Sequence, residues 1–514
     1  MRRLFLTLLA LLMPLAAQAQ WREASTPHFV IYSQQGPERL REFATNLERF
    51  DKGLRALRGA KDDVLGTSGR VTIYVVDDTD DVKALIGDRQ VAGFYIARAG
   101  GSMAVVPRAS GASSDIALGP LAILLHEYGH HFMFSVAPHS AFPAWFVEGF
   151  AEFHATAVFG KDGGITFGEP PLYRGIGIMR GNMLPIEKLM IADTLKLSPE
   201  QRDAMYGRGW LLTHYLTIGQ PARAGQLGKY IAAINAGSKP IDAATGAFGD
   251  LRTLDKELER YKLGKFRISR LIGASLAVGE PAIRVLGPGE AAMMKVRIRS
   301  RVGVGPKDVP DLYADARKAA APFPNDPAVQ IILAGAALDA SDYPGAEAAA
   351  DRAIAADPKA LDAWLHKSQA RTLAARKSGD RDKARWEAIR KLIITANRLD
   401  PDNPRPLIRY YLSFGDAGEA PIEAARQGLS RAMELAPHDR GLRLLATTMF
   451  LRQGNKVVAR QLLAPLAYQP HSPALAARAQ KLIALIDEGK IEAALADLSG
   501  KPEAPDDEDS KSPA

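Results

Sequence analysis

Residues 121–134 read LAILLHEYGHHFMF, which places two histidines and a glutamate inside an apolar run. In a helix, positions four apart lie on one face, so His126 and His130 point the same way. Glu127 follows the first histidine and can be directed at the same point. The alternative is a core helix that carries histidines without a metal. That alternative accounts for a lone histidine better than for two histidines at this spacing. His-Glu-x-x-His on a helix is typical of zinc binding by two imidazoles, with the glutamate as general base.

A second apolar helix is predicted over residues 142–155, FPAWFVEGFAEFHA, with Pro143 near its start. A catalytic zinc takes three protein ligands and keeps one position for water. Glu148, eighteen positions after His130, is the predicted third ligand. Glu152 lies one helical turn further and is expected to accept an N–H from a ligand histidine, which fixes its tautomer. A solvated acidic face is the alternative, but the surrounding aromatic residues leave little of this helix exposed.

HEYGH followed by W-F-x-E-G-F-A-E resembles the gluzincin clan of zinc metallopeptidases, in which the second helix supplies a glutamate ligand. The chain is also similar to a peptidase-MA-like group of exported bacterial proteins of unassigned function. The shared segments are Pro27–Tyr32, Gly93–Tyr95, Tyr206–Leu216 and Ala247–Gly249. The resemblance implies an α+β zincin-like (gluzincin) metallopeptidase domain over residues 20–264. The amine-anchoring motif of the aminopeptidase branch is missing, so the resemblance does not imply exopeptidase action.

The resemblance implies that His126, His130 and Glu148 hold Zn²⁺ and that Glu127 takes a proton from a bound water. The family similarly uses a tyrosine or histidine from the helical subdomain to stabilise the oxyanion. Tyr206 is our candidate for this role, although a tyrosine that only packs its own helix is an equally good explanation. The other candidate positions are expected to have lesser roles: His214 as a runner-up, Tyr128 as an occasional neighbour, and His131 and His154 as bystanders.

The region before the zinc motif reads as a small α/β unit. Strands are predicted at residues 28–33 and 70–77, and apolar residues at three- and four-residue spacing predict a helix over residues 38–57. Residues 94–106 read as a hairpin that turns at two glycines. Its second strand, Met103–Val106, is expected to hold an extended peptide by edge pairing, as in other gluzincins.

The rest of the zincin-like region, residues 116–264, reads as mostly helical. Residues 265–305 are then predicted to form a small β linker or subdomain, with AAMMKVRIRS (291–300) as the clearest strand.

Residues 306–498 are rich in alanine and carry recurring prolines at successive spacings of 31, 43, 36 and 33 residues. This period resembles the helix–turn–helix unit of tetratricopeptide repeats and implies an α-helical solenoid. The 43-residue interval predicts an insertion, which we place at residues 375–387. An irregular helical bundle is the alternative. Residues 499–514 are acidic with few apolar groups and are expected to be disordered.

The N-terminus is predicted to be a secretory signal peptide, residues 1–19. Arg2 and Arg3 precede an apolar run from Leu4 to Leu15, and Ala17-Gln18-Ala19 supplies a small-x-small cleavage site. The run is too short to cross a bilayer, and no later apolar run is long enough. The mature chain is therefore expected to be exported to the periplasm, with no transmembrane segment.

The overall composition restricts both the metal site and the partners. The chain has 514 residues, enough for two to four domains, and no cysteine, so a zinc site must use histidine and carboxylate ligands. Loss of Arg2 and Arg3 lowers the net charge from +8 to +6, which is modest for this length and does not favour nucleic-acid binding.

Two functions follow from these features. The first is an exported zinc metallopeptidase that cleaves protein or peptide substrates, with the repeats recruiting clients or protein partners. The alternative is a non-catalytic protein-binding scaffold in which the repeats act and the zincin-like domain is structural.

Overall fold

The computed structural model describes residues 20–62, 66–86, 93–108, 118–192, 196–468 and 472–500. The predicted signal peptide and residues 501–514 of the predicted disordered tail lie outside these ranges. Within these ranges, no helix has the length and apolar character needed to cross a membrane.

A six-stranded sheet forms the centre of the front half, in the order β4-β5-β3-β2-β1-β9. Its strands are β1 (Arg22–Ser25), β2 (Phe29–Ser33), β3 (Val71–Val76), β4 (Phe94–Ile96), β5 (Met103–Pro107) and β9 (Ala282–Val285). Strands β2, β3 and β5 run parallel, while β4 and the pair β1 and β9 are antiparallel to their neighbours. The strands and hairpin predicted from the sequence are therefore present, and their Val, Ile and Tyr residues suit a pleated surface.

The position of the hairpin strands differs from the prediction. Strand β5 lies between β4 and β3, so Met103–Val106 is an interior strand and the prediction of a free edge there is wrong. Strand β4 is the edge strand at this end of the sheet, and β9 is the edge strand at the other end. Hairpin connectivity did not reveal this because a hairpin strand pairs on its second side with whichever strand the tertiary fold brings there.

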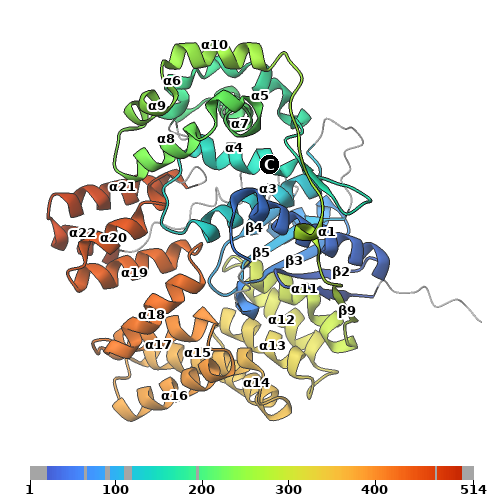
Figure 1. Ribbon diagram of the computed structural model, residues 1–514. Coiled ribbons are helices and arrows are strands. Elements are labelled where there is room, and N and C mark those ends of the chain that lie inside the picture. Colours follow the sequence, from blue (N-terminus) through green and yellow to red (C-terminus); the bar gives the residue numbers. More distant parts are fainter. Residues whose placement is uncertain are drawn as a thin grey trace, which may run out of the picture.

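Helices cover both faces of this sheet (Figure 1). On one face lie α1 (Pro37–Arg58) and α3 (Pro120–Val136), whose apolar residues share one core with the sheet. On the other lie α2 (Thr79–Ile86) and α11 (Pro288–Val302). The helix expected over residues 38–57 is therefore confirmed as α1.

The strand predicted over residues 291–300 is wrong, because these residues belong to helix α11. Met294 and Ile298, four positions apart, pack against the sheet, whereas Met293 and Val296 pack against the first repeat helices. A helix buried on two sides loses the single apolar stripe that identifies it in a sequence. Helix α11 thus joins the sheet to the repeats directly.

A helical layer follows the sheet in the chain and lies above it in Figure 1. Its helices are α4 (Ala144–Ala155), α5 (Gly175–Met179), α6 (Ile186–Met190), α7 (Pro199–His214), α8 (Gln226–Asn235), α9 (Pro240–Phe248) and α10 (Leu251–Tyr261). A small second sheet contains β6 (Val158–Phe159), β7 (Ile165–Phe167) and β8 (Ser269–Leu271). Strands β6 and β7 were not predicted, whereas β8 lies within the predicted β linker of residues 265–305. Shorter turns are η1 (Thr67–Gly69), η2 (Leu172–Arg174), η3 (Gly181–Met183), η5 (Tyr215–Gly219), η6 (Pro221–Arg223), η7 (Ala274–Leu276) and η8 (Leu466–Tyr468).

The remaining helices form an array of helix pairs that curves around the lower and left side of the front half (Figure 1). They are α12 (Val309–Ala320), α13 (Pro327–Asp339), α14 (Tyr343–Ala356), α15 (Leu361–Ser378), α16 (Lys383–Leu399), α17 (Pro404–Ala417), α18 (Glu423–Leu435), α19 (Arg440–Arg452), α20 (Lys456–Leu463), α21 (Pro473–Asp487) and α22 (Ile491–Ser499). Small residues such as Ala346, Ala349 and Ala353 are fully buried between neighbouring helices, which lets the helix axes approach closely. We call this segment the repeat array.

Capping residues explain the recurring punctuation of the repeat array. Asp326, Asp382 and Asp439 each accept a backbone N–H at a helix N-terminus, and prolines occupy first turns or inter-helix turns. The predicted insertion at residues 375–387 is wrong as a separate element. Those residues complete α15 and begin α16, so the longer interval reflects two longer helices of 18 and 17 residues.

Candidate metal centre

Helices α3 and α4 bring the sequence-predicted residues together. Helix α3 supplies the two histidines and Glu127, and α4 supplies the two glutamates. Gly129 lies where the helices touch, because a Cβ there would come within 3.3 Å of the Ala151 Cα atom. Gly149, next to Glu148, faces the backbone of Gly209 on α7 with no room for a side chain. The small residues in both motifs therefore set the close helix spacing on which the site depends.

Three donor atoms converge between these helices. His126 Nε2 lies 3.1 Å from His130 Nε2, and Glu148 Oε2 lies 3.4 Å and 3.7 Å from these two nitrogens. A tetrahedral zinc with bonds of about 2.0–2.2 Å holds its ligand atoms roughly 3.3–3.6 Å apart. Glu148 is completely buried, and His126 and His130 are 7% and 6% exposed. Two imidazole nitrogens and one carboxylate at these separations fit a zinc ion.

Glu152 lies behind the first histidine, on the side away from the other ligands. Its Oε1 atom is 3.6 Å from His126 Nδ1, which is longer than a hydrogen bond but within ion-pair range. Two neighbours fix this buried carboxylate: Tyr173 donates its hydroxyl to Oε2 at 2.8 Å, and Arg174 donates Nε–H to Oε1 at 2.8 Å. Glu152 is therefore in a position to orient His126.

Tyr173 and Arg174 were missed by the sequence analysis. They belong to the short turn η2, which follows Pro170-Pro171, more than twenty positions from Glu152. A tyrosine–arginine pair after two prolines is an ordinary loop sequence, so no local pattern signals that both side chains meet a buried glutamate. The contact exists because the chain returns to α4 after strands β6 and β7.

Tyr206 of α7 lies beside the candidate ligands. Its ring stacks on that of His126 with centroids 6.3 Å apart, and the Arg174 guanidinium lies 4.4 Å from the Tyr206 ring centroid. Burial raises the pKa of Tyr206 well above its ordinary value, and Glu148 adds to this effect. The hydroxyl therefore keeps its proton and remains a hydrogen-bond donor at the site.

Carboxylates dominate the electrostatics around His126. Burial acts to lower the pKa of this imidazole, but the Glu148 hydrogen bond and the charge of Glu152 outweigh it, so the pKa is raised. Glu127 contributes in the same direction and is itself half-buried. The negative field that holds a proton on His126 would equally favour a divalent cation.

The other histidines have different partners. Both ring nitrogens of His214 are engaged, with the Tyr261 hydroxyl and the Arg267 carbonyl at 2.9 Å each, so His214 is occupied away from the ligand group. His154 lies 2.7 Å from the Phe150 carbonyl, and His131 lies 2.6 Å from the Tyr95 hydroxyl. We expected His131 and His154 to stand outside the site. The structure gives no support to His214 as an oxyanion donor.

Tyr128 points away from the ligands and connects α3 to α1. Its hydroxyl donates to Asp51 Oδ1 at 2.7 Å, and Asp51 also pairs with Arg55 at 2.6 Å. His28 and Asp62 complete this group, which is the second cluster of possible metal ligands in the described part of the chain. Lys52 and Arg55 already supply its positive charge, so this cluster holds the helices together rather than an ion.

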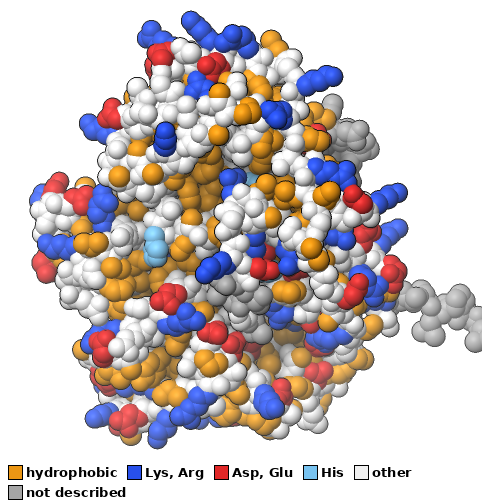
Figure 2. Space-filling model, viewed as in Figure 1, with side chains coloured by type: hydrophobic (Ala, Val, Ile, Leu, Met, Phe, Trp, Pro, Cys, Tyr) orange, Lys and Arg blue, Asp and Glu red, His pale blue; other side chains and the backbone are white. Residues whose placement is uncertain are grey.

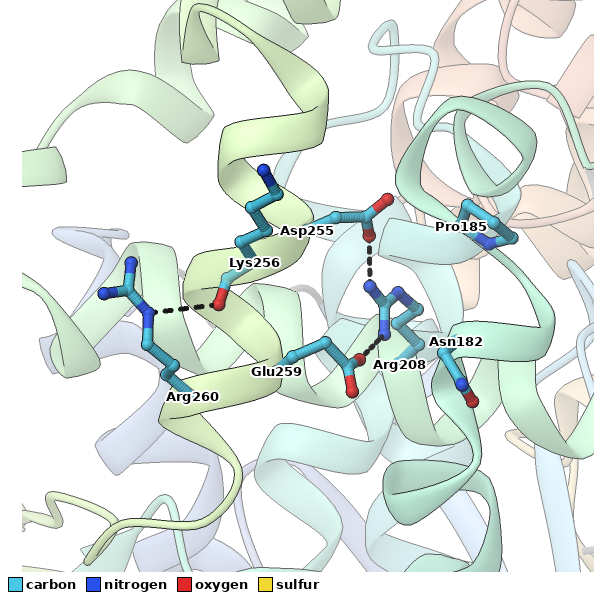
Figure 3. A pocket seen from close by; sticks show the side chains of 7 residues that line it. All are labelled: Asn182, Pro185, Arg208, Asp255, Lys256, Glu259 and Arg260. Atoms are coloured by element: carbon cyan, nitrogen blue, oxygen red, sulfur yellow. Dashed lines mark hydrogen bonds and ion pairs between the residues drawn. The ribbon is translucent and has the colours of Figure 1, made fainter.

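Helix α7, which carries Tyr206, is held from its far side (Figure 3). Arg208 is 1% exposed and pairs with Asp255 and, at 2.8 Å, with Glu259 of α10. These residues line a pocket together with Asn182, Pro185, Lys256 and Arg260. Arg208 pairs with both carboxylates of the pocket, and this ion-pair group ties α7 to α10.

Comparison with known proteins adds little to this geometry. No protein-family model matches the chain, and no curated protein matches it. Among solved structures, it is similar to a thermophilic tetratricopeptide-repeat protein of Thermus thermophilus, with 19% identity and a TM-score of 0.32. That match covers 38% of this chain and 97% of the other. The assignment of residues 306–498 as helical repeats is therefore based on the observed helix pairs. The gluzincin resemblance of the front half remains a prediction.

Proposed function

We propose that this protein is a zinc-dependent metallopeptidase. The convergence of the His126, His130 and Glu148 donor atoms, 3.1–3.7 Å apart in a buried site, is the observation that carries the proposal. Zinc is the ion of choice for two imidazoles and a carboxylate. Glu127 is not needed for binding alone, and its presence beside the ligands favours hydrolysis over a purely structural ion.

In this proposal each side chain has a separate task. Zinc, when bound, would polarise a peptide carbonyl and lower the pKa of a water molecule. Glu127 takes a proton and passes it to the leaving amine. Tyr206 donates its hydroxyl to the carbonyl oxygen as negative charge develops there. Glu152, held by Tyr173 and Arg174, keeps His126 in the tautomer that directs Nε2 to the metal.

The substrate in this proposal is an extended peptide or an unfolded protein segment. Strand β4 (Phe94–Ile96) ends the strand order of the main sheet and packs beside α3, the helix with the two histidines. A peptide that pairs with β4 would run along the ligand helix, with its main chain held independently of its sequence. Export to the periplasm, which we also propose, would make envelope proteins the source of such segments.

The test compares Glu127→Gln with the wild type in a peptide-library digest, with zinc measured in both. We expect hydrolysis to disappear while zinc stays at about one per chain, because the glutamate is a base and not a ligand. Glu42→Gln, on the exposed side of α1, is the matched control and should cleave normally. Full activity of Glu127→Gln, or wild type purified without zinc, would contradict the proposal.

A protein-binding scaffold is the second candidate, and one groove in the repeat array favours it. Apolar residues such as Leu412, Leu445 and Met449 line a cavity of about 740 Å³ between α17, α19 and α22, and Arg426 and Arg452 also line it. Figure 2 shows basic and acidic side chains interspersed over the visible face, as expected for a surface that meets proteins rather than nucleic acid. Full-length Glu127→Gln should capture such a partner, and Leu445→Asp should not.

A further inference from the structure

The turn of the β4–β5 hairpin is held by the repeat array and by helix α11, which carries Arg301. Asp439 accepts the backbone N–H of Ala99 at 2.7 Å, and Arg301 donates to the Gly101 carbonyl at 3.2 Å. The His438 ring lies 3.3 Å from the carbonyl of Arg98. These contacts join residues roughly two hundred to three hundred and forty positions apart.

The turn fits its surroundings closely. Ala99 is 5% exposed and belongs to the same apolar cluster as Phe414 and Leu429 of the array. A Cβ at Gly100 would lie 3.1 Å from the Arg405 side chain, and Gly101 has a φ of +100°, which favours glycine. The turn therefore contacts the array through the side chain and backbone N–H of Ala99 and through Gly100.

Asp439 uses its two carboxylate oxygens for different tasks. Oδ1 accepts the N–H of Leu442 at 2.7 Å and caps helix α19, while Oδ2 accepts the N–H of Ala99. Hydrogen bonds to an ionised carboxylate are stronger than neutral ones. Because the two tasks fall on two oxygens, a substitution can remove one and leave the other.

The same hairpin reaches the candidate metal centre. Tyr95 of β4 lies 2.6 Å from His131 Nδ1, and His131 directly follows the ligand His130 on α3. The His131 ring also lies 4.9 Å from that of His438, centroid to centroid. The turn that links α18 to α19 therefore contacts both the hairpin turn and the ligand helix.

We propose that Asp439 is a positioning residue: through Ala99 the repeat array fixes strand β4 beside the ligand helix. The inner side of the array at α18–α19 is then occupied by the hairpin turn of the same chain. A client recruited by the array must use another surface, such as the groove between α17, α19 and α22. The effect on catalysis rests on the proposed function, whereas the effect on strand β4 does not.

The test uses Asp439→Ser in the full-length protein. A serine caps a helix with its single hydroxyl oxygen, so α19 keeps its N-cap while the bond to Ala99 is lost. Asp382→Ser is the matched control, because Asp382 caps α16 through Arg385, within the repeat array itself. Amide hydrogen exchange of residues 93–106 is measured without substrate, and peptide hydrolysis and zinc content are measured in parallel.

We expect exchange in the hairpin to quicken about tenfold in Asp439→Ser, the size of effect of one charge-assisted hydrogen bond, and to stay unchanged in Asp382→Ser. Peptide hydrolysis should fall through KM more than through kcat, with zinc still bound, because the strand that receives the peptide is loosened. Unchanged exchange in Asp439→Ser would overturn the proposal whatever the activity. If no variant or wild type hydrolyses peptides, the proposed function fails and the exchange result still decides the positioning role.

Ala99→Glu approaches the same contact from the hairpin. A larger, negatively charged side chain beside Asp439 should also loosen residues 93–106, and the double variant should add little to either single change. Full additivity of the two substitutions would show that they act on separate contacts and would overturn the assignment.

Discussion

In the described part of the front half, two clusters place histidines next to buried carboxylates, and we propose only the first as a metal site. In the first, His126, His130 and Glu148 converge with their donor atoms directed at one another. In the second, His28 and Asp51 lie among cations: Arg55 pairs with Asp51 at 2.6 Å, and Lys52 pairs with Asp62 at 3.1 Å. The difference lies in the charge that completes each cluster. Cationic side chains pair with the carboxylates of the second cluster, whereas Glu148 in the first lies against two imidazoles.

The largest expected difference between the clusters is in zinc binding. His126→Ala removes one of three ligands, so we expect bound zinc to fall from about one per chain to nearly none. His28→Ala should keep its zinc, because the second cluster holds helices together. Metal analysis after dialysis measures both. If His28→Ala lost its zinc and His126→Ala kept it, the two assignments would be reversed.

The second cluster should make the larger contribution to the free energy of unfolding. Asp51→Ala leaves the Tyr128 hydroxyl and Arg55 without their buried acceptor, and we expect a loss of about 2–3 kcal/mol in the free energy of unfolding. Asp62→Ala is the control, because Asp62 is 44% exposed and its pairs are screened by solvent, so the change should stay below about 1 kcal/mol. Urea unfolding measures both. Equal losses would mean that the cluster acts as a surface ion-pair group.

The residues that hold Glu152 beside the first cluster should affect the affinity of the site for zinc. Arg174→Met removes the cation that holds Glu152, so we expect the zinc dissociation constant to rise by about one to two powers of ten. Arg180→Met, on the exposed surface nearby, should leave the constant unchanged. Competition with a chelator gives the two constants. An unaltered constant in Arg174→Met would remove Glu152 from the account of the metal centre.

The smallest effect is a pH dependence of stability from His28. Burial acts to lower its pKa, but the Glu48 hydrogen bond and Asp51 outweigh it, so the pKa is raised above 6.5. A raised folded-state pKa stabilises the fold below the unfolded pKa, and this stabilisation is lost as pH rises through the folded value. The unfolding free energy of wild type relative to His28→Gln should therefore decline above neutral pH. A difference independent of pH would show that His28 is not charged in the fold.

Much of the candidate site was predictable because its signals are local. The four-residue spacing of His126 and His130 and the similar spacing of Glu148 and Glu152 define helix faces without knowledge of any partner. The surrounding apolar residues show that both helices are buried. The same logic identified strands β2 and β3, the hairpin and the repeat helices.

Other features depended on contacts between distant segments. Helix α11 was mistaken for a strand because it is buried on two sides, which hides its period. The edge of the sheet was assigned to β5 because local pairing does not show which strand lies on its second side. Tyr173 and Arg174 meet Glu152 only because the chain returns to α4 after strands β6 and β7.

The sequence by itself determined which side chains have ligand chemistry, on which helices they lie and that a helical array follows. Period, spacing and composition are properties of neighbouring residues, so they can be recognised in the sequence without knowledge of the fold. Only the tertiary structure decided that three donor atoms lie 3.1–3.7 Å apart, that β4 rather than β5 is an edge strand and that Asp439 holds the hairpin turn. Those facts depend on packing between segments that are remote in the chain, and no local pattern records such packing.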